Sequence, residues 1–220
     1  MMKLSDLSLS RRLALKTGAW VAAALVIGLP PARILKAASG EPTSQPVKKK
    51  QLGFLYDENK CIECWACAMA CKKANNWEEG VHWRKIFSSD NHSLSMSCNH
   101  CADPACLKVC PVKAYTKREK DGIVVHNPKK CVGCGYCLYA CPYHAPQFGE
   151  TSGAISKCSF CYQRQDQGWD PVCVSACPVK ALRYGDVEML RKEAGANESL
   201  IKGLPSPKIT KPSLVMIAKK

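Results

Sequence analysis

The residues best able to do chemistry in this 220-residue chain are its sixteen cysteines, which fall into four groups of four with none left over. We call these groups motifs one to four. Motifs one and three have the spacing CxxCxxCxxxC, whereas the gap between the second and third cysteines widens to four residues in motif two and to eleven in motif four. In chain order the motifs are Cys61, Cys64, Cys67 and Cys71, then Cys98, Cys101, Cys106 and Cys110, then Cys131, Cys134, Cys137 and Cys141, and finally Cys158, Cys161, Cys173 and Cys177.

This spacing favours iron–sulfur clusters over zinc and over disulfides. A loop with three cysteines can wrap three corners of a [4Fe–4S] cube, and the short helix that follows carries the fourth cysteine to a neighbouring cluster. Zinc prefers a compact tetrahedron of four ligands, usually from two separated pairs. The sequence therefore predicts four [4Fe–4S] clusters, with all sixteen cysteines as iron ligands and electron transfer as the function. It offers no nucleophile with a base, no phosphate-binding glycine loop and no dinucleotide fingerprint, so we expect no catalytic site.

An internal repeat indicates how the cysteines are positioned. Residues 110–114 and 177–181 both read CPVKA, and residues 141–145 read CPYHA. Such self-similarity is typical of a duplicated unit. We therefore expect two ferredoxin-like modules over residues 51–185, with an α+β fold. Regular secondary structure should be sparse, because the clusters occupy the volume that a hydrophobic core would fill.

The elements that carry the motifs are predicted to be short. Strands are expected at residues 52–56, 82–87, 122–126 and 182–184, and helices at residues 67–74, 105–110, 137–141 and 172–177. Beyond them, residues 186–220 are expected to form a C-terminal helix and a docking tail. The helix should span 186–194, with Asp186 near its start and Gly195 after it. Three prolines after Leu204 predict an extended tail laid on a surface, and residues 208–217 are the expected partner-docking segment.

The first forty residues have the pattern of an export signal. Two adjacent arginines in SRRLALK (residues 10–16) precede an apolar stretch at 19–29, which is too short to span a membrane. Small residues follow at 37–39, so residues 1–39 are predicted to be a cleaved twin-arginine signal and 40–50 a linker. The alternatives are an uncleaved anchor or an ordinary polar N-terminus. Export by this route carries folded proteins, which predicts a periplasmic location, or one on the outer face of the cytoplasmic membrane, with membrane attachment only through a partner.

The formal net charge of +14 is also typical of proteins that bind nucleic acid. Residues 1–39 hold six basic residues and one acidic residue, so the remainder carries +9. Four clusters on sixteen thiolates contribute about −8, which brings the loaded protein to about +1. We interpret the basic excess as balance for the clusters and expect no nucleic-acid partner. A zinc-stabilised nucleic-acid-binding module is the alternative from another class.

The histidines and tryptophans are given structural roles. Because the cysteines already supply four ligands for each cluster, the histidines are expected to be structural or surface groups, and the tryptophans to shield clusters from water. These residues are His82, His92, His100, His126 and His144, and Trp65, Trp77, Trp83 and Trp169.

Three stretches around the motifs resemble the iron–sulfur electron-transfer subunits of the dimethyl sulfoxide reductase family of molybdenum oxidoreductases. They are SCNHCADPACLKVCP at 97–111, CVGCGYCLYACPYHAPQF at 131–148 and KCSFCYQRQDQGWDPVCVSACPVKAL at 157–182. The resemblance runs from about Leu52 to the C-terminus. It implies a subunit that relays electrons between a quinol-oxidising integral membrane subunit and a molybdopterin catalytic subunit. An alternative within electron transfer is a quinol dehydrogenase module that feeds a cytochrome c nitrite reductase or a hydrogenase.

The resemblance also implies which motifs share clusters: one with four, and two with three. The implied ligand sets are Cys61, Cys64, Cys67 and Cys177 (cluster 1), Cys98, Cys101, Cys106 and Cys141 (cluster 2), Cys131, Cys134, Cys137 and Cys110 (cluster 3), and Cys158, Cys161, Cys173 and Cys71 (cluster 4). The sequence alone also permits motif one to pair with two, and three with four.

Two features depart from the family pattern. The subunit of dimethyl sulfoxide reductase usually lacks an export signal, whereas related subunits that serve nitrite, tetrathionate and polysulfide reduction have one, so the terminal acceptor stays open. The second is Glu63 in motif one, where motif three has Gly133. An unpaired carboxylate beside a cluster disfavours the added electron and should lower its reduction potential. The other interpretation is a solvated surface glutamate.

Overall fold

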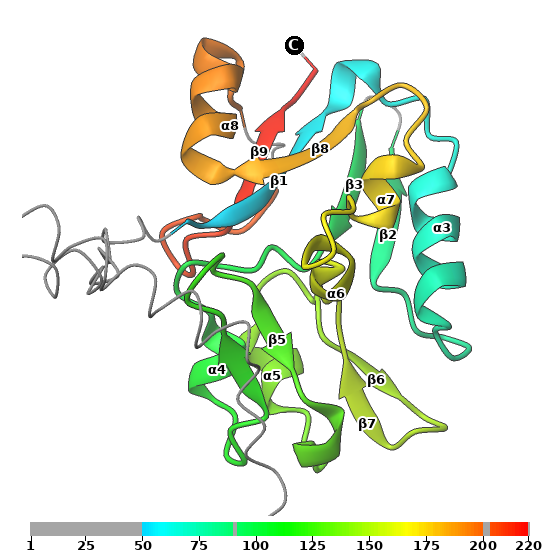
Figure 1. Ribbon diagram of the computed structural model, residues 1–220, viewed down its shortest axis with the longest axis vertical. Helices are drawn as coiled ribbons and strands as arrows, with labels where there is room; N and C mark the ends of the chain where they lie inside the picture. Colours follow the sequence, from blue (N-terminus) through cyan, green and yellow to red (C-terminus); the bar gives the residue numbers. More distant parts are fainter. Residues whose placement is uncertain (1–49, 90–91, 200–202, 220) are drawn as a thin grey trace, which may run out of the picture. The chain divides into compact units, whose positions relative to one another are not determined.

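The computed structural model describes residues 50–89, 92–199 and 203–219 (Figure 1). The predicted signal at 1–39 and nearly all of the linker at 40–50 lie outside these residues. No helix among the described residues is long and apolar enough to cross a membrane.

A three-stranded sheet organises the chain, in the order β8 (Leu182–Asp186), β1 (Leu52–Asp57), β9 (Leu214–Ile217). β1 runs antiparallel to β8 and parallel to β9. All six residues of β1 are buried, which a central strand with both faces covered requires. The predictions of strands at 52–56 and 182–184 are confirmed.

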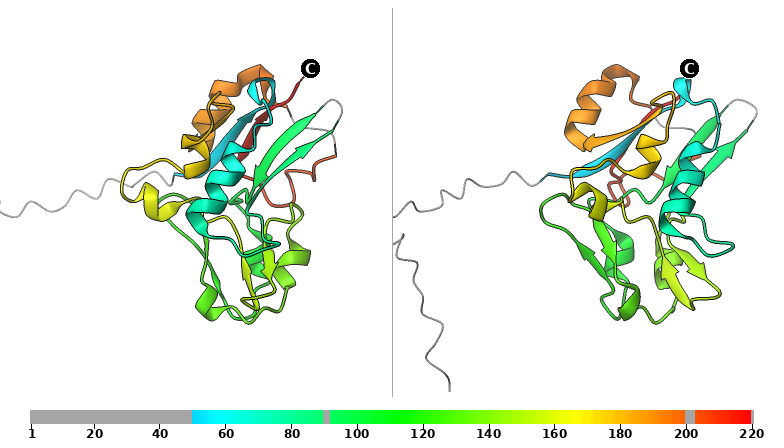
Figure 2. Two further views of the ribbon diagram at one scale, coloured as in Figure 1. Left: turned by 90° about the vertical axis from the view of Figure 1, so that its right-hand side faces the viewer. Right: turned by 45° about the vertical axis from the view of Figure 1, so that its right-hand side comes forward.

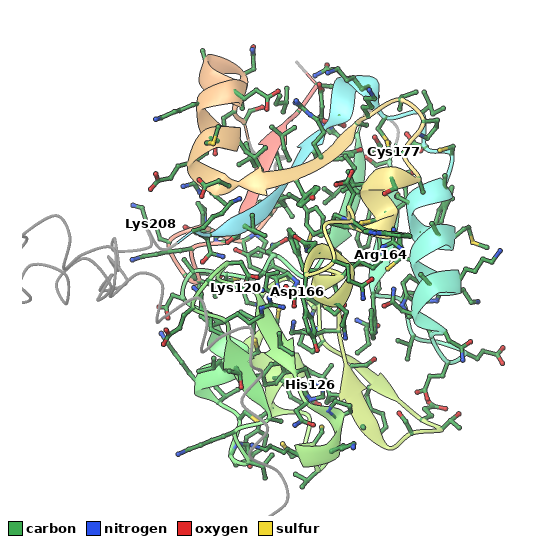
Figure 3. All side chains as sticks on the ribbon, viewed as in Figure 1. Lys120, His126, Arg164, Asp166, Cys177 and Lys208 are labelled. Atoms are coloured by element: carbon green, nitrogen blue, oxygen red, sulfur yellow. The ribbon has the colours of Figure 1, made fainter. Side chains whose placement is uncertain are left out.

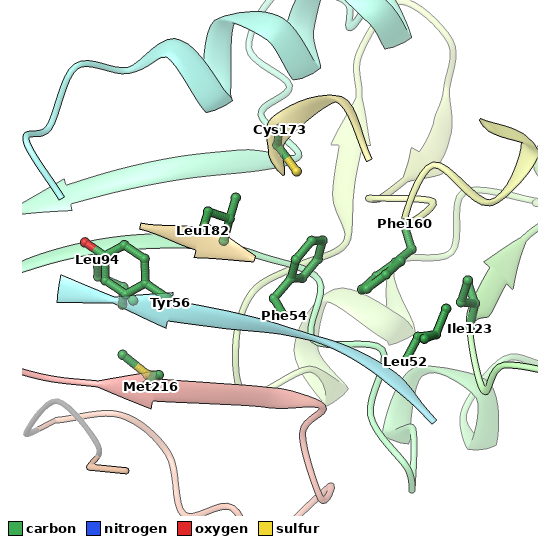
Figure 4. Packing of buried hydrophobic residues seen from close by; sticks show 9 residues of the cluster. All are labelled: Leu52, Phe54, Tyr56, Leu94, Ile123, Phe160, Cys173, Leu182 and Met216. Carbon is green, nitrogen blue, oxygen red and sulfur yellow. The ribbon is translucent and has the colours of Figure 1, made fainter. Parts of the chain in front are cut away.

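The two faces of β1 pack against different partners because alternate side chains point to opposite sides. Leu55 packs with Val215 and with helix α8 (Val187–Ala194). Leu52, Phe54 and Tyr56 face the other way, toward a cluster of buried side chains that includes Phe160 and Cys173 (Figure 4). The first face thus forms a small aliphatic core. The second packs in the cluster that contains Cys173.

Helix α8 begins and ends as the sequence predicts. The Asp186 side chain accepts hydrogen bonds from the amides of Glu188 (3.0 Å) and Met189 (3.4 Å), which caps the first turn. Gly195 ends the helix with a positive φ of 53°.

The tail corrects one expectation. Residues 214–217 do not lie on a surface as a docking segment but form strand β9 of the central sheet, where Val215 is 0% and Met216 is 1% exposed. The apolar run LVMI provides the physical reason, since it covers β1 more favourably than it would face water. Within the predicted docking segment, only the part before β9 retains exposed side chains, such as Lys208 and Ile209.

Three antiparallel hairpins complete the strand inventory of the described residues. They are β2 (Arg84–Ser88) with β3 (Ser93–Ser97), β4 (Tyr115–Lys117) with β5 (Val124–His126), and β6 (Gln147–Gly149) with β7 (Ala154–Ser156). The predictions at 82–87 and 122–126 match β2 and β5. β3, β4, β6 and β7 were not predicted.

Short helices carry the cysteines, as expected. They are α3 (Ala66–Asn75), α4 (Ala105–Lys108), α5 (Tyr136–Ala140) and α7 (Val172–Ser175), with α6 (Tyr162–Gln165) as an unpredicted addition. α3 packs against α7, and the two lie side by side in each view of Figures 1 and 2. Single 3₁₀ turns occur at η1 (Glu58–Lys60), η2 (Pro128–Lys130) and η3 (Gly195–Asn197).

The chain path around motif one repeats around motif three. In each case a strand leads into a capped 3₁₀ turn, η1 or η2, and then into the cysteine loop and a helix. The capping side chains are Asp57 and Asn127, which accept from the amides two residues later at 3.1 and 3.0 Å. Both loops also use left-handed backbone at the same two positions. These are Glu63 and Trp65 in motif one (φ 55° and 63°), and Gly133 and Gly135 in motif three (φ 68° and 76°).

Candidate metal centres

Three cavities are each lined by four cysteines. The first contains Cys61, Cys64, Cys67 and Cys177; the second contains Cys98, Cys101, Cys106 and Cys141; the third contains Cys110, Cys131, Cys134 and Cys137. Every cavity combines three cysteines of one motif with the last cysteine of another. The first joins motif one to motif four, and the other two join motifs two and three.

The remaining four cysteines form a fourth set. Cys71 lies on α3 and Cys173 on α7, the two helices that pack together. Cys177, which belongs to the first set, follows shortly after α7 (Figure 3). Cys71 belongs to a buried cluster against which Val172, the neighbour of Cys173, is packed. Burial raises the pKa of the Cys71 thiol, and the nearby thiols of Cys158, Cys173 and Cys161 add to this increase. All four members of the set are buried. This set therefore joins the last cysteine of motif one to the first three of motif four.

Strand pairing explains why these motifs meet. The amide of Asp57, just before motif one, donates to the carbonyl of Ala181, just after motif four, at 2.8 Å. These residues flank the β1–β8 pair, which brings the loops at its end together. The β4–β5 pair does the same for motifs two and three.

Backbone amides are directed at several cysteine sulfurs. The amides of Gly133 and Ile155 both donate to Cys131 Sγ at 3.5 Å, that of Phe160 donates to Cys158 Sγ at 3.3 Å, and that of Ala114 donates to Cys110 Sγ at 3.3 Å. Such N–H···S bonds stabilise the thiolate form of the sulfur. The loops thus prepare these sulfurs for metal binding.

Burial is the main factor that disfavours charged sulfur here. It raises the pKa of Cys106 to about 12, and those of Cys101 and Cys158 to about 11, with the neighbouring Cys98 thiol adding to each increase. Iron binds the thiolate, and its positive charge compensates this penalty. All sixteen cysteines are free of disulfides, so the donor set fits iron–sulfur clusters.

A single zinc ion suits the arrangement poorly. Zinc draws its sulfur ligands to about 2.3 Å from one point. Among the described residues, no three His, Cys, Asp or Glu side chains form a group suited to holding one metal ion. Three of the four sets instead line the walls of separate cavities.

The four sets are arranged in a row. Cys173 of the fourth set packs in one buried cluster with Cys67 and Cys177 of the first. Lys157 lines the second cavity and donates to the carbonyl of Cys158 of the fourth set at 3.0 Å. The Tyr115 ring borders both the third and the second sets, through Cys137 and Cys106. The order is therefore first, fourth, second, third. The two exposed cysteines, Cys64 and Cys134, belong to the first and third sets, at the ends of this row.

Comparisons with known proteins agree with this chemistry. A family model described as a 4Fe-4S dicluster domain matches residues 90–187, which contain motifs two, three and four. The B subunit of the anaerobic dimethyl sulfoxide reductase of Escherichia coli (strain K12) is 42% identical over 182 residues, covering 76% of this chain and 88% of that protein. This chain belongs to the iron–sulfur electron-transfer subunits of the dimethyl sulfoxide reductase family.

Other members of the dimethyl sulfoxide reductase family show similar likeness. The formate dehydrogenase iron-sulfur subunit of Wolinella succinogenes is 39% identical over 165 residues, covering 62% of this chain and 82% of that one. The thiosulfate reductase electron transfer subunit of Salmonella typhi is 38% identical over 149 residues, with coverages of 63% and 77%. As in these relatives, the role is electron transfer and not catalysis, as the sequence predicted.

The histidines and tryptophans that were given structural roles differ in burial and in contacts. His100 is fully buried, and its Nδ1 accepts from the Val124 amide at 3.1 Å. Trp77 is buried in a cluster with Cys71. Trp65 and Trp169 are more than half exposed. Trp65 lines the first cavity nevertheless, whereas the Trp169 ring stacks under Arg164.

The sequence did not single out two buried cations near the cysteines. Arg84 on β2 is within electrostatic reach of thiols from the first and fourth sets. Lys157 lines the second cavity and donates to the carbonyl of Cys158 at 3.0 Å. Lys157 is one of several basic residues beside cysteine motifs, and Arg84 lies 13 residues from the nearest cysteine in the sequence, so burial is what distinguishes both.

Proposed function

We propose that this subunit relays electrons through four [4Fe–4S] clusters between a quinol-oxidising integral membrane subunit and a molybdopterin catalytic subunit. The observation that carries the proposal is the arrangement of sixteen cysteines as four sets of four, three of them lining cavities. The membership of the dimethyl sulfoxide reductase family supports it further.

The proposed ligands of clusters 1 to 3 follow the cavities, and those of cluster 4 are the four remaining cysteines. Cluster 1 takes Cys61, Cys64, Cys67 and Cys177; cluster 2 takes Cys98, Cys101, Cys106 and Cys141; cluster 3 takes Cys131, Cys134, Cys137 and Cys110; cluster 4 takes Cys158, Cys161, Cys173 and Cys71. Motifs one and four then build one ferredoxin-like module, and motifs two and three build the other. The repeated strand, 3₁₀ turn and loop support this division.

Bound clusters of this type supply one-electron reduction and oxidation. The chain's own residues hold the ligands, exclude water and set the local charge. The row of sites supports a linear path, because neighbouring sets are joined by shared packing or hydrogen bonds at each step. Its two ends, at Cys64 and Cys134, reach the surface, as sites that exchange electrons with two separate partners require.

The location of the protein is proposed from the sequence. The twin-arginine pattern in residues 1–39 supports export of the folded, cluster-loaded chain to the periplasm or the outer face of the cytoplasmic membrane. Attachment to the membrane would then occur through the quinol-oxidising subunit.

Anaerobic purification of the natively matured protein with its partners tests the proposal. We expect a brown protein with broad absorption near 400 nm and about sixteen irons, on a stoichiometry of four per cluster. Mass spectrometry should identify a molybdopterin subunit and a membrane subunit. A colourless protein that contains zinc, or one that copurifies with nucleic acid, would contradict it. A cytochrome partner in place of the molybdopterin subunit would point to a quinol dehydrogenase module.

A further inference from the structure

Arg84 is a cation sealed within the cysteine-bearing part of the molecule. Its residue is only 2% exposed, and it lies on β2 directly opposite Ser97 of β3. Nη2 donates to Ser97 Oγ at 2.9 Å and Nη1 to Ser95 Oγ at 3.0 Å. The two serines share a face because they are two residues apart on one strand. The hairpin thus fixes the guanidinium in one position.

The hydrogen-bond partners of Arg84 are uncharged, yet a buried guanidinium needs a negative partner. No carboxylate among residues 50–89, 92–199 and 203–219 forms an ion pair with it. Its Nε has no hydrogen-bond partner within these residues either. The groups that favour its charge are thiols: Cys173, Cys158, Cys67 and Cys71. The guanidinium also lies over the Phe54 ring, 4.8 Å from its centroid, and Phe54 packs in the same buried cluster as Cys173. The cysteine sites therefore offer the negative charge that this buried cation lacks.

These four thiols belong to two neighbouring sets. Cys67 lines the first cavity, and the other three belong to the fourth set. Ser95 also lines the first cavity, and its Oγ lies 3.5 Å from Cys67 Sγ. Ser95 Oγ accepts a hydrogen bond from Arg84, so the hydroxyl hydrogen of Ser95 is free to donate to Cys67 Sγ. The two consecutive hydrogen bonds then polarise each other.

We propose that Arg84 is the shared countercharge of clusters 1 and 4, and that it raises the reduction potentials of both. This inference rests on the proposed function. A fixed cation stabilises the added electron on either neighbour, and the low dielectric of the interior strengthens the effect. A guanidinium suits the role because it stays protonated at all relevant pH values. Arg84 is a positioning and tuning residue and binds no iron.

Redox titration of the purified complex, followed by electron paramagnetic resonance, tests the role. Arg84→Gln should lower two of the four midpoint potentials and leave two unmoved. We expect each affected reduction equilibrium to weaken at least tenfold, which is about 59 mV for one electron. Ser95→Ala should lower one potential only, that of cluster 1. Arg84→Lys, which keeps the charge, should shift both potentials less than Arg84→Gln. Arg191→Gln removes an exposed charge on α8 and serves as the matched control.

Four unmoved potentials in an Arg84→Gln protein with full iron content would overturn the proposal, as would equal shifts in all four. If Arg84→Gln does not retain iron, the decision passes to Ser95→Ala, and an unchanged set of potentials there overturns it. A wild-type protein without four clusters would contradict the proposed function instead. Iron counting on the wild type therefore separates the two failures.

Discussion

The amide of Asn127 donates a hydrogen bond to the carbonyl of Ala114 across 2.8 Å. This bond joins the chain just before motif three to the chain just after motif two. Asp57 and Ala181 make the same bond, also at 2.8 Å, between motifs one and four. Two equivalent strand pairs thus determine which cysteine motifs lie together, and the order of motifs along the chain does not.

The pairing of motifs leads to a test with ligand variants. Cys177→Ser and Cys64→Ser should remove the same paramagnetic signal, because both side chains line the first cavity. Cys71→Ser should remove the signal that Cys161→Ser removes. Spectra of the four variants provide the measurement. The assignment is wrong if Cys177→Ser and Cys161→Ser abolish one common signal while Cys64→Ser abolishes a different one.

Gly133 is expected to be essential for the third cavity. Its φ is 68°, and an added Cβ would lie 2.5 Å from the carbonyl oxygen of Gly153. Gly133→Ala combines this clash with a left-handed strain of roughly 1–2 kcal/mol. We expect the loss of one cluster, hence of about a quarter of the iron.

Gly153→Ala is the matched control for that change. Its φ is 62°, and an added Cβ would meet no atom within 4 Å, so it carries the strain without the clash. Iron content should stay near the wild-type value. Equal iron loss in both variants would show that backbone strain alone is responsible.

Glu63 lines the first cavity, and the Ser88 hydroxyl donates to its carboxylate. The hydrogen bond offsets part of the negative charge. Glu63→Gln should therefore raise the potential of cluster 1, by less than a tenfold change in its reduction equilibrium, about 59 mV. Redox titration measures the shift, with Glu119→Gln on the surface as the control. A potential that stays unchanged would support the solvated-glutamate interpretation.

Strand β9 of the C-terminal tail is expected to stabilise the folded protein. Burial of Val215 and Met216 contributes on the order of 1.5–3 kcal/mol each. Removal of residues 214–220 should therefore lower the melting temperature and the iron retained after mild heating. Ile209→Asp, at a residue 58% exposed, should change neither. A truncated chain that melts with the intact protein would contradict the role of β9.

The sequence was most informative where spacing limits geometry. Motif spacing predicted the helices that carry Cys71 and Cys173, and the caps Asp186 and Gly195 predicted both ends of α8. Boundaries of the short helices differed by one or two residues, because a single turn has few internal hydrogen bonds to define its ends.

Long-range pairing was less accessible from the sequence. β9 follows three prolines, a pattern that favours a surface segment, and only its parallel register with β1 explains its burial. Arg84 is not distinguished by its neighbours in the sequence either. Its importance comes from Ser95 and Ser97 across the hairpin, in a strand that was not predicted. Burial of a charge depends on such tertiary contacts, which local patterns do not encode.

On the proposed ligation, the return of motif four to motif one also determines when each ligand set becomes complete during synthesis. A growing chain folds from its N-terminal end as it leaves the ribosome. Motifs two and three are complete once residue 141 has emerged, whereas Cys61, Cys64 and Cys67 lack their fourth ligand until Cys177 arrives. The two clusters of the middle motifs can therefore be inserted before the other two. A prematurely ended chain would hold only two of the four clusters, and its electron-transfer path would be incomplete.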